Sequence, residues 1–480
     1  MQKSQTCNVQ LLIDGEWRPG DGNETKAIRN PANEEEIARL ACACESDLED
    51  AVQSARRGFE IWSRTAARER SLVLARAAAL LKEELESVSQ AITTEQGKPM
   101  FEARLEVAAA VEVLDWFSGE AVRTYGRVIP ARQREVVQQV VREPVGPVAA
   151  FTPWNFPVVQ SVRKLAAALA AGCSVVMKGP EETPSACAAL FRILHKAGVP
   201  AGAINLVFGE PAEISRFLIP HPEIRKISFT GSVAIGRQIA SLAGLHMKRT
   251  TMELGGHAPA IIFNDADLDV ALEVLTTQKF RNAGQVCISP TRFLVQTEVY
   301  EEFVDRFSSN ALEIKVGDGF LPETRMGPLA HARRIDAMET MVADAKRLGA
   351  HINCGGVRLK NKGFFFAPTI ICEPPTNASV MNDEPFGPIA AVSRFSDADE
   401  AIEEANRLPV GLAAYAYTRS SKMARRLAQE VKCGMLSLNH HGLGLAETPV
   451  GGVMDSGYGS EGGSEGIEPY LHTKFVSEFR

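Results

Sequence analysis

The chain has 480 residues, of which 45% are hydrophobic and 23% are charged, and its formal net charge is -7. These proportions are those of a globular protein with room for two or three domains. The acidic charge gives no support for a nucleic-acid or membrane-surface partner. The apolar stretch at residues 165–177 is too short to cross a bilayer, which takes about 20 residues.

Nine cysteines, an odd number without regular spacing, do not form a disulfide framework. Cys42 and Cys44 are close in sequence, but no second pair completes a zinc site, so we expect no metal. Residues 1–10 are polar and lack the apolar core of a signal peptide. The sequence therefore predicts a reduced protein of the cytoplasm.

Short strands and turns are expected in the first forty residues, with an apolar strand at 9–13 and a turn at Asp14-Gly15. From 47 to about 94, apolar residues recur three and four positions apart, which predicts helical structure. A further helix is expected over 102–125. These elements are typical of a scaffold and carry no motif for chemistry.

A polar, valine-rich run at residues 126–144 alternates in character from one residue to the next. The C-terminal run at 470–476 alternates in the same way. Alternation of this kind is typical of a strand with one exposed face. We expect 126–144 to be an exposed edge strand in need of a partner.

After this run, apolar strands alternate with helices. A buried strand at 145–151 leads into an alanine-rich helix that ends at Gly172, a residue suited to a helix C-terminus. Thr183 and Pro184 favour the start of another helix, because threonine caps helices and proline suits the first helical position. Such alternation, repeated from residue 256 onward, predicts an α/β fold with doubly wound parallel sheets.

Cys287 follows a Gly-Gln-Val turn, directly after a predicted helix that ends near Phe280. A thiol at such a junction can act as a nucleophile, because the thiolate is highly reactive and nearby backbone amides lower its pKa. A lone cysteine is more often a small buried hydrophobic residue. The choice between these roles depends on motifs elsewhere in the chain.

Three further motifs accompany Cys287 in a fixed order. They are Pro-Trp-Asn-Phe-Pro at 153–157, Met-Glu-Leu-Gly-Gly at 252–256 and Glu-Pro-Phe-Gly-Pro at 384–388. With them the chain resembles the NAD(P)-dependent aldehyde dehydrogenase superfamily over nearly its whole length, and within it the succinate-semialdehyde dehydrogenases. The resemblance implies that Cys287 is the nucleophile, that Glu253 activates water and that Asn155 stabilises an oxyanion.

The resemblance also implies a division into domains. A variant Rossmann domain that binds NAD would comprise residues 1–125 and 145–255, and a catalytic domain that carries Cys287 would comprise 256–453. Residues 126–144 and 467–480 would form a β-ribbon oligomerisation arm with a swapped strand. A homodimer or homotetramer is therefore expected.

The cofactor site is expected at the carboxyl ends of the first set of strands. Gly231 and Ser232 follow a strand and open a helix, whose free amides and positive dipole end suit a pyrophosphate. The resemblance places Lys178 and Glu181 on the adenosine ribose, where a carboxylate favours NAD over NADP. The alternative for Glu181 is a solvated residue before a helix, and Gly179 departs from the family pattern. Further cofactor contacts implied by the resemblance are Thr152, Trp154, Glu384 and Phe386.

Arg163 and Arg281 match the arginines that bind the distal carboxylate in succinate-semialdehyde dehydrogenases. Two guanidinium groups around one carboxylate would give charge-assisted, bidentate recognition; ordinary salt bridges are the alternative. The apolar loop at 442–446 stands where that subfamily has a serine-rich loop. This departure favours a longer or partly apolar substrate, such as a glutarate, 2-oxoglutarate or aryl-bearing semialdehyde.

Glu461 is a candidate proton-relay carboxylate, with a structural role as the alternative. A broad-specificity aldehyde dehydrogenase and an esterase that uses the same thiol are alternative functions. A non-enzymatic binding protein would be expected to have lost Cys287, Glu253 or Asn155, and all three are present.

Overall fold

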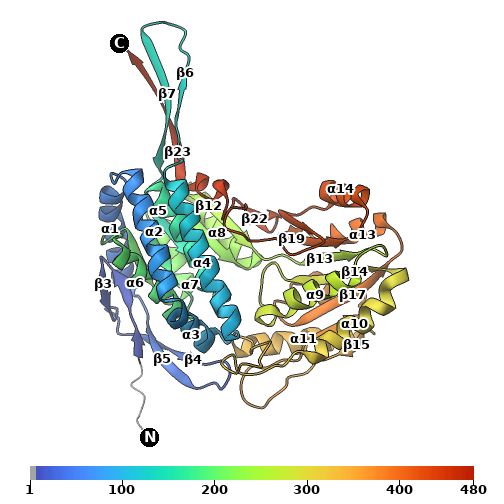
Figure 1. Cartoon of the computed structure of the whole chain (residues 1–480). Coiled ribbons are helices and arrows are strands. Elements are labelled where there is room, and N and C mark those ends of the chain that lie inside the picture. The colour runs from blue at the N-terminus through green and yellow to red at the C-terminus, as the bar shows by residue number, and fades with distance from the viewer. Residues whose placement is uncertain (1–6) are drawn as a thin grey trace.

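The computed structural model describes residues 7–480, which form a mixed α/β protein with two large sheets and a projecting arm (Figure 1). Most of the polar segment on which the signal-peptide prediction depends lies outside these residues. No helix in the described part of the chain is long and apolar enough to span a membrane.

The first large sheet has eight strands in the order β22-β12-β11-β8-β9-β10-β2-β3. Its five central strands run parallel, and β8, β9 and β10 are buried along their whole length, as their apolar sequences predict. The strands are β2 (Leu11–Ile13), β3 (Glu16–Arg18), β8 (Val148–Phe151), β9 (Val175–Lys178), β10 (Ile204–Val207), β11 (Lys226–Gly231), β12 (Arg249–Leu254) and β22 (Gly457–Tyr458).

Helices surround this sheet in two groups. One group connects the parallel strands: α5 (Val159–Ala171), α6 (Pro184–Ala197), α7 (Pro211–Leu218) and α8 (Val233–Leu245). The other precedes the arm: α1 (Glu45–Trp62), α2 (Ala67–Glu83), α3 (Leu85–Gln96) and α4 (Met100–Ala121), with α4 packed on α2 and α5. Helix α5 is thus enclosed, and every residue from 161 to 171 is buried.

The second large sheet has seven strands in the order β15-β16-β17-β14-β13-β19-β20, all parallel except the edge strand β15. The strands are β13 (Ala258–Ile262), β14 (Pro290–Gln296), β15 (His351–Cys354), β16 (Thr369–Cys372), β17 (Ile389–Phe395), β19 (Ala413–Tyr417) and β20 (Met435–Leu438). The helices are α9 (Leu268–Phe280), α10 (Tyr300–Glu313), α11 (Ala332–Arg347), α12 (Ser379–Asn382), α13 (Ala398–Ala405) and α14 (Ser421–Glu430). The predicted doubly wound α/β fold is confirmed.

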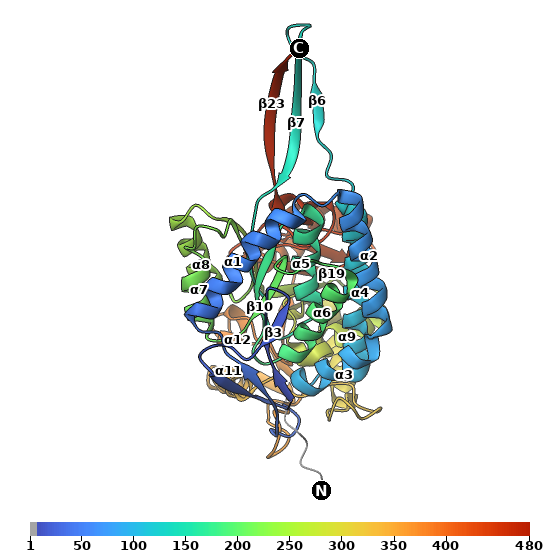
Figure 2. The ribbon, with the colours of Figure 1, turned by 90° about the vertical axis from the view of Figure 1, so that its left-hand side faces the viewer.

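The arm is a three-stranded antiparallel sheet of β6 (Arg127–Ile129), β7 (Val136–Pro144) and β23 (Leu471–Phe479), and it stands away from the body in both views (Figures 1 and 2). The prediction of an unpaired edge strand is wrong for β7, which lies in the middle of this sheet. The two alternating runs pair with each other along nine residues. The role of this arm in oligomer formation stays a prediction.

Two local predictions need correction. The apolar segment 9–13 is not one strand, because it divides between β1 (Cys7–Val9) and β2, which belong to different sheets. Strand β1 joins β4 (Thr25–Arg29) and β5 (Glu36–Ala41) in a small sheet. Thr183 does not cap α6 with its side chain; its hydroxyl instead donates to the carbonyl of Trp154 at 3.3 Å. This bond ties the start of α6 to the first predicted site motif.

Candidate active site

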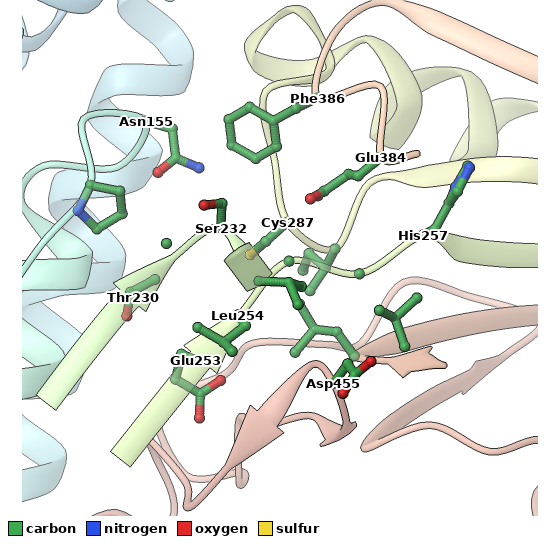
Figure 3. A pocket seen from close by; sticks show the side chains of 18 of the residues that line it. Asn155, Thr230, Ser232, Glu253, Leu254, His257, Cys287, Glu384, Phe386 and Asp455 are labelled. Carbon is green, nitrogen blue, oxygen red and sulfur yellow. The ribbon is translucent and has the colours of Figure 1, made fainter. Parts of the chain in front are cut away.

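A cavity of about 780 Å³ lies where the chain passes from β12 to β13, and so from the first large sheet to the second. Figure 3 shows Cys287 near the centre of the labelled side chains, with Asn155 above it and Glu253 below it. Of the sequence-predicted site residues, the cavity is lined by Trp154, Asn155, Gly231, Ser232, Glu253, Cys287, Glu384, Phe386 and Glu461. Residues separated by three hundred positions in the chain are thus brought together.

The loop before Cys287 has an unusual backbone. After α9 the chain makes a 3₁₀ turn in which Asn282 and Ala283 have φ values of 50° and 52°. Gly284 also has a positive φ of 71°, and a Cβ there would lie 2.1 Å from the carbonyl oxygen of Gly387. Only glycine fits that position. The turn gives the thiol its place at the start of the segment that leads into β14.

Buried hydrogen bonds hold this turn against the Asn155 segment. The Asn282 side-chain amide donates to the Asn155 carbonyl at 3.0 Å, and the Asn155 amide Nδ2 donates to the Gln285 carbonyl at 3.0 Å. The ammonium group of Lys98, which is paired with Glu106 at 2.7 Å, donates to the same Asn155 carbonyl at 2.8 Å. The Asn155 side chain is therefore held by Gln285, which lies two residues before Cys287 in the chain. The sequence analysis missed Lys98 and Glu106, which belong to no recognised motif.

The two central ionisable groups are protonated more readily than usual. Burial raises the pKa of the Cys287 thiol to about 12, and the Glu384 and Glu253 carboxylates add to this effect while Arg281 opposes it. Burial also raises the pKa of Glu253 well above its usual range, and the nearby Glu461 carboxylate raises it further. Among residues 7–480, the Glu253 Oε1 atom has no hydrogen-bond partner. A carboxylate with a raised pKa is a stronger base than an ordinary glutamate.

Glu461 belongs to a buried polar cluster behind Glu253. It forms an ion pair with Lys164, whose ammonium group also donates to the Thr230 hydroxyl at 2.7 Å and the Ser228 hydroxyl at 3.2 Å. Lys164 opposes the rise in the pKa of Glu253. The sequence analysis missed Lys164, although a lysine within an alanine-rich buried helix is a usable signal, because such a charge needs a partner.

The two predicted substrate arginines lie in different settings. Arg163 is buried, and its guanidinium donates to the backbone carbonyls of Glu461, at 2.9 Å, and Gly444. Arg281 lies with its guanidinium carbon 5.7 Å from the centre of the Phe156 ring, and its Nε has no hydrogen-bond partner in the described part of the chain. Of the two, Arg281 is the one that presents an unused donor beside Cys287.

The turn from β11 to α8 is tightly packed at two glycines. Ser232 is the N-cap of α8, and its hydroxyl accepts a hydrogen bond from the Ile235 amide at 3.4 Å. A Cβ at Gly231 would lie 2.5 Å from the Phe229 ring, and a Cβ at Gly236 would lie 2.3 Å from the Leu254 side chain. A side chain at either position would displace these neighbours, and the helix N-terminus beside the cavity offers free amides.

Residues 17–476 match the sequence model of the Aldehyde dehydrogenase family. The chain belongs to this family. It is 46% identical over 467 residues to the 4-(hydroxymethyl)benzenesulfonate dehydrogenase of Comamonas testosteroni, with 97% of each chain covered. It is 40% identical over 467 residues to the 3-sulfolactaldehyde dehydrogenase of Pseudomonas putida, and this match covers 97% of this chain and 96% of the relative. Its structure matches that of succinate-semialdehyde dehydrogenase from Burkholderia pseudomallei with a TM-score of 0.97 at 36% identity, over 100% of both chains.

The protein is thus an aldehyde dehydrogenase, and its family uses NAD(P). A dinucleotide fits the residues present, because the glycine turn and the start of α8 can cradle a pyrophosphate. Lys178, the last residue of β9, forms an ion pair with Glu181, and the Thr152 amide donates to the Lys178 carbonyl at 3.3 Å. These three residues lie at the carboxyl ends of β8 and β9 but do not line the cavity itself.

Another part of the cavity wall is aromatic. The Trp154 ring lies edge-on to Phe386, with centroids 5.6 Å apart, and edge-on to His331, with centroids 5.2 Å apart. The guanidinium carbon of Arg334 lies 5.9 Å from the Phe386 ring centre. The sequence analysis of this aldehyde dehydrogenase missed His331 and Arg334, because neither residue belongs to one of the four motifs.

Among residues 7–480, no three or more histidine, cysteine or acidic side chains are grouped as metal ligands would be. The eight cysteines whose side chains are described, Cys287 included, are free thiols.

Proposed function

We propose that this aldehyde dehydrogenase oxidises an aldehyde with a distal anionic group to the corresponding acid, with NAD as the preferred cofactor. The supporting observation is Arg281, whose positive charge is close enough to Cys287 to influence the pKa of the thiol. Its buried Nε atom has no hydrogen-bond partner in the described part of the chain. The relatives support the same class of substrate, since sulfolactaldehyde, benzenesulfonate and succinate semialdehyde all carry an anion.

In the proposed reaction, Cys287 adds to the aldehyde carbon and forms a thiohemiacetal. The thiol proton is released to solvent, and the raised pKa of Glu253 makes this carboxylate a competent base for the later hydrolysis. The second amide hydrogen of Asn155 and the backbone N–H of Cys287 stabilise the developing oxyanion. Loss of one such donor typically slows a reaction about 100- to 1,000-fold.

NAD, when bound, accepts the hydride that leaves the carbonyl carbon. We assign its pyrophosphate to Gly231 and Ser232, its nicotinamide end to Trp154, Glu384 and Phe386, and its adenosine ribose to Lys178 and Glu181. The product on the protein is a thioester at Cys287. Glu253 then deprotonates a water molecule that attacks the thioester, and the acid leaves as the thiol is restored.

A comparison of charged and neutral aldehydes tests the substrate class. The ratio of kcat/KM for succinate semialdehyde to kcat/KM for butanal is expected to exceed about tenfold, because a hydrogen bond to a charged group is worth about 1.5–3 kcal/mol. The same ratio for 4-formylbenzenesulfonate and benzaldehyde shows whether a sulfonate on a ring is preferred. Equal rates for charged and neutral members of both pairs would contradict the proposal. Arg281→Ala should reduce each ratio.

The cofactor preference depends on Glu181. Wild-type protein is expected to use NAD better than NADP, and Glu181→Ser should narrow the difference about tenfold, since the carboxylate no longer repels a 2′-phosphate. Glu182→Ser is the matched control, because Glu182 is paired with Arg333 at 3.0 Å instead of with Lys178. Steady-state kinetics with both cofactors measures this. A wild-type preference for NADP, or equal effects of both substitutions, would contradict the assignment.

A further inference from the structure

The loop that follows β20 carries a histidine close to the reacting thiol. The His441 ring is stacked on the Tyr415 ring, with centroids 5.9 Å apart and an interplanar angle of 24°. The Tyr415 hydroxyl donates to the carbonyl of Ile288 at 2.6 Å, and Ile288 directly follows Cys287. One side chain therefore separates the His441 imidazole from the backbone next to the nucleophile.

Arg281 flanks the same region from the Asn155 side. Its guanidinium lies over the ring of Phe156, which directly follows Asn155. The guanidinium charge reaches His441, since burial and Arg281 together lower the pKa of the imidazole to about 4. His441 is therefore neutral at pH 7 and can donate one hydrogen bond.

Each of these side chains has an unused polar atom. Within residues 7–480, neither Arg281 Nε nor His441 Nδ1 has a hydrogen-bond partner, although both atoms are buried. Buried polar atoms are nearly always satisfied, so an exception calls for an explanation such as an absent ligand. Arg281 influences the pKa of both Cys287 and His441, so its cation lies close to each of them. Two unpartnered nitrogens on neighbouring side chains, one of them cationic, point to an anion as that ligand.

We propose that His441 is a specificity-determining residue that binds the distal anionic group of the aldehyde together with Arg281. This inference rests on the proposed function and adds a residue to it. A neutral imidazole in the Nδ1–H form donates to a carboxylate or sulfonate oxygen without placing a second positive charge beside the guanidinium. The pair thus combines a charge with a directional bond.

Arg163 supports this arrangement from behind. Its bond to the carbonyl of Gly444, three residues after His441, and its bond to the carbonyl of Glu461 fix the loop in place. We therefore assign Arg163 a positioning role. Its guanidinium contacts backbone oxygens that an incoming anion would have to displace.

Replacement of His441 by phenylalanine and by glutamine tests the proposal. Phenylalanine keeps a ring over Tyr415 but has no polar atom, whereas glutamine keeps a donor. His441→Phe is expected to lower the charged-to-neutral kcat/KM ratio about tenfold or more, and His441→Gln should recover much of the loss. His440→Phe is the matched control, because the neighbouring His440 is exposed and its substitution should leave the ratio unchanged.

The ratio is measured with succinate semialdehyde against butanal and with 4-formylbenzenesulfonate against benzaldehyde, which separates carboxylate from sulfonate recognition. A His441→Phe ratio within about twofold of wild type would overturn the role of His441. A parallel loss on charged and neutral aldehydes with a lower Tm would overturn it too, since it indicates packing on Tyr415. A wild-type ratio near one would instead contradict the proposed function itself.

Discussion

Cys287→Ala is expected to abolish aldehyde oxidation, with no NADH formed above the background rate. The reason is that hydride transfer requires a tetrahedral carbon, and the thiol of Cys287 is the group that creates it. The measurement is NADH absorbance with an aldehyde substrate in excess. NAD binding, followed by calorimetry, should stay close to wild type because the cofactor contacts we propose lie on other residues.

Cys433→Ala provides the control for this substitution. Cys433 is also a partly buried free thiol in the second half of the chain, but it does not line the cavity. Its replacement should leave turnover within about twofold of wild type, as is usual for a change away from a reactive site. Normal aldehyde oxidation by Cys287→Ala would disprove the covalent mechanism.

Glu253→Gln is expected to separate acylation from deacylation. The variant should release about one NADH per active site and then stop, because the thioester forms but water is not activated. The steady-state rate should fall about 100- to 10,000-fold. Rapid-mixing absorbance measures the burst. If burst and steady state vanish together, Glu253 is needed before hydride transfer, as the acceptor of the thiol proton.

The pH dependence of hydrolysis follows from the same carboxyl group. Its pKa is raised, so the deprotonated form that activates water is present above this raised pKa and is lost as pH falls through it. The deacylation rate of the wild type should therefore decrease as the pH is lowered. This decrease should begin at pH values well above the usual titration range of a glutamate. A rate that stays constant down to pH 5 would show that Glu253 is not the base.

The sequence predicted most helices and strands, and its motifs identified residues that line the cavity. Apolar runs such as those of β8 and β9 predict buried parallel strands. Their alternation with helices predicts the doubly wound α/β fold. Asn155, Glu253 and Cys287 were selected through motifs, and the structure places all three around one cavity. Their roles stay predictions until the variants are measured.

Long-range partners could not be predicted in the same way. Arg163 and Arg281 looked equivalent in the sequence, but only the fold brings Gly444 and Glu461 to the Arg163 guanidinium. Strand β7 likewise has its main partner more than three hundred residues away, in β23. Local pattern identifies a strand or a charge and leaves open which distant group it meets.

His441 illustrates the same limit at the site. In the sequence His440 and His441 are adjacent, and no local pattern separates the roles of the two. In the structure His440 is exposed, whereas His441 is partly buried against Tyr415. The difference comes from the path of the loop, which hydrogen bonds from Arg163 help to fix.

Mass spectrometry of the Glu253→Gln variant tests the covalent mechanism most directly. The protein is mixed with NAD and succinate semialdehyde, quenched in acid during the stalled phase and digested. We expect the peptide that contains Cys287 to gain the mass of one succinyl group, in an amount that matches the NADH burst. A burst of NADH with an unmodified Cys287 peptide, or with the acyl group on another residue, would contradict the mechanism.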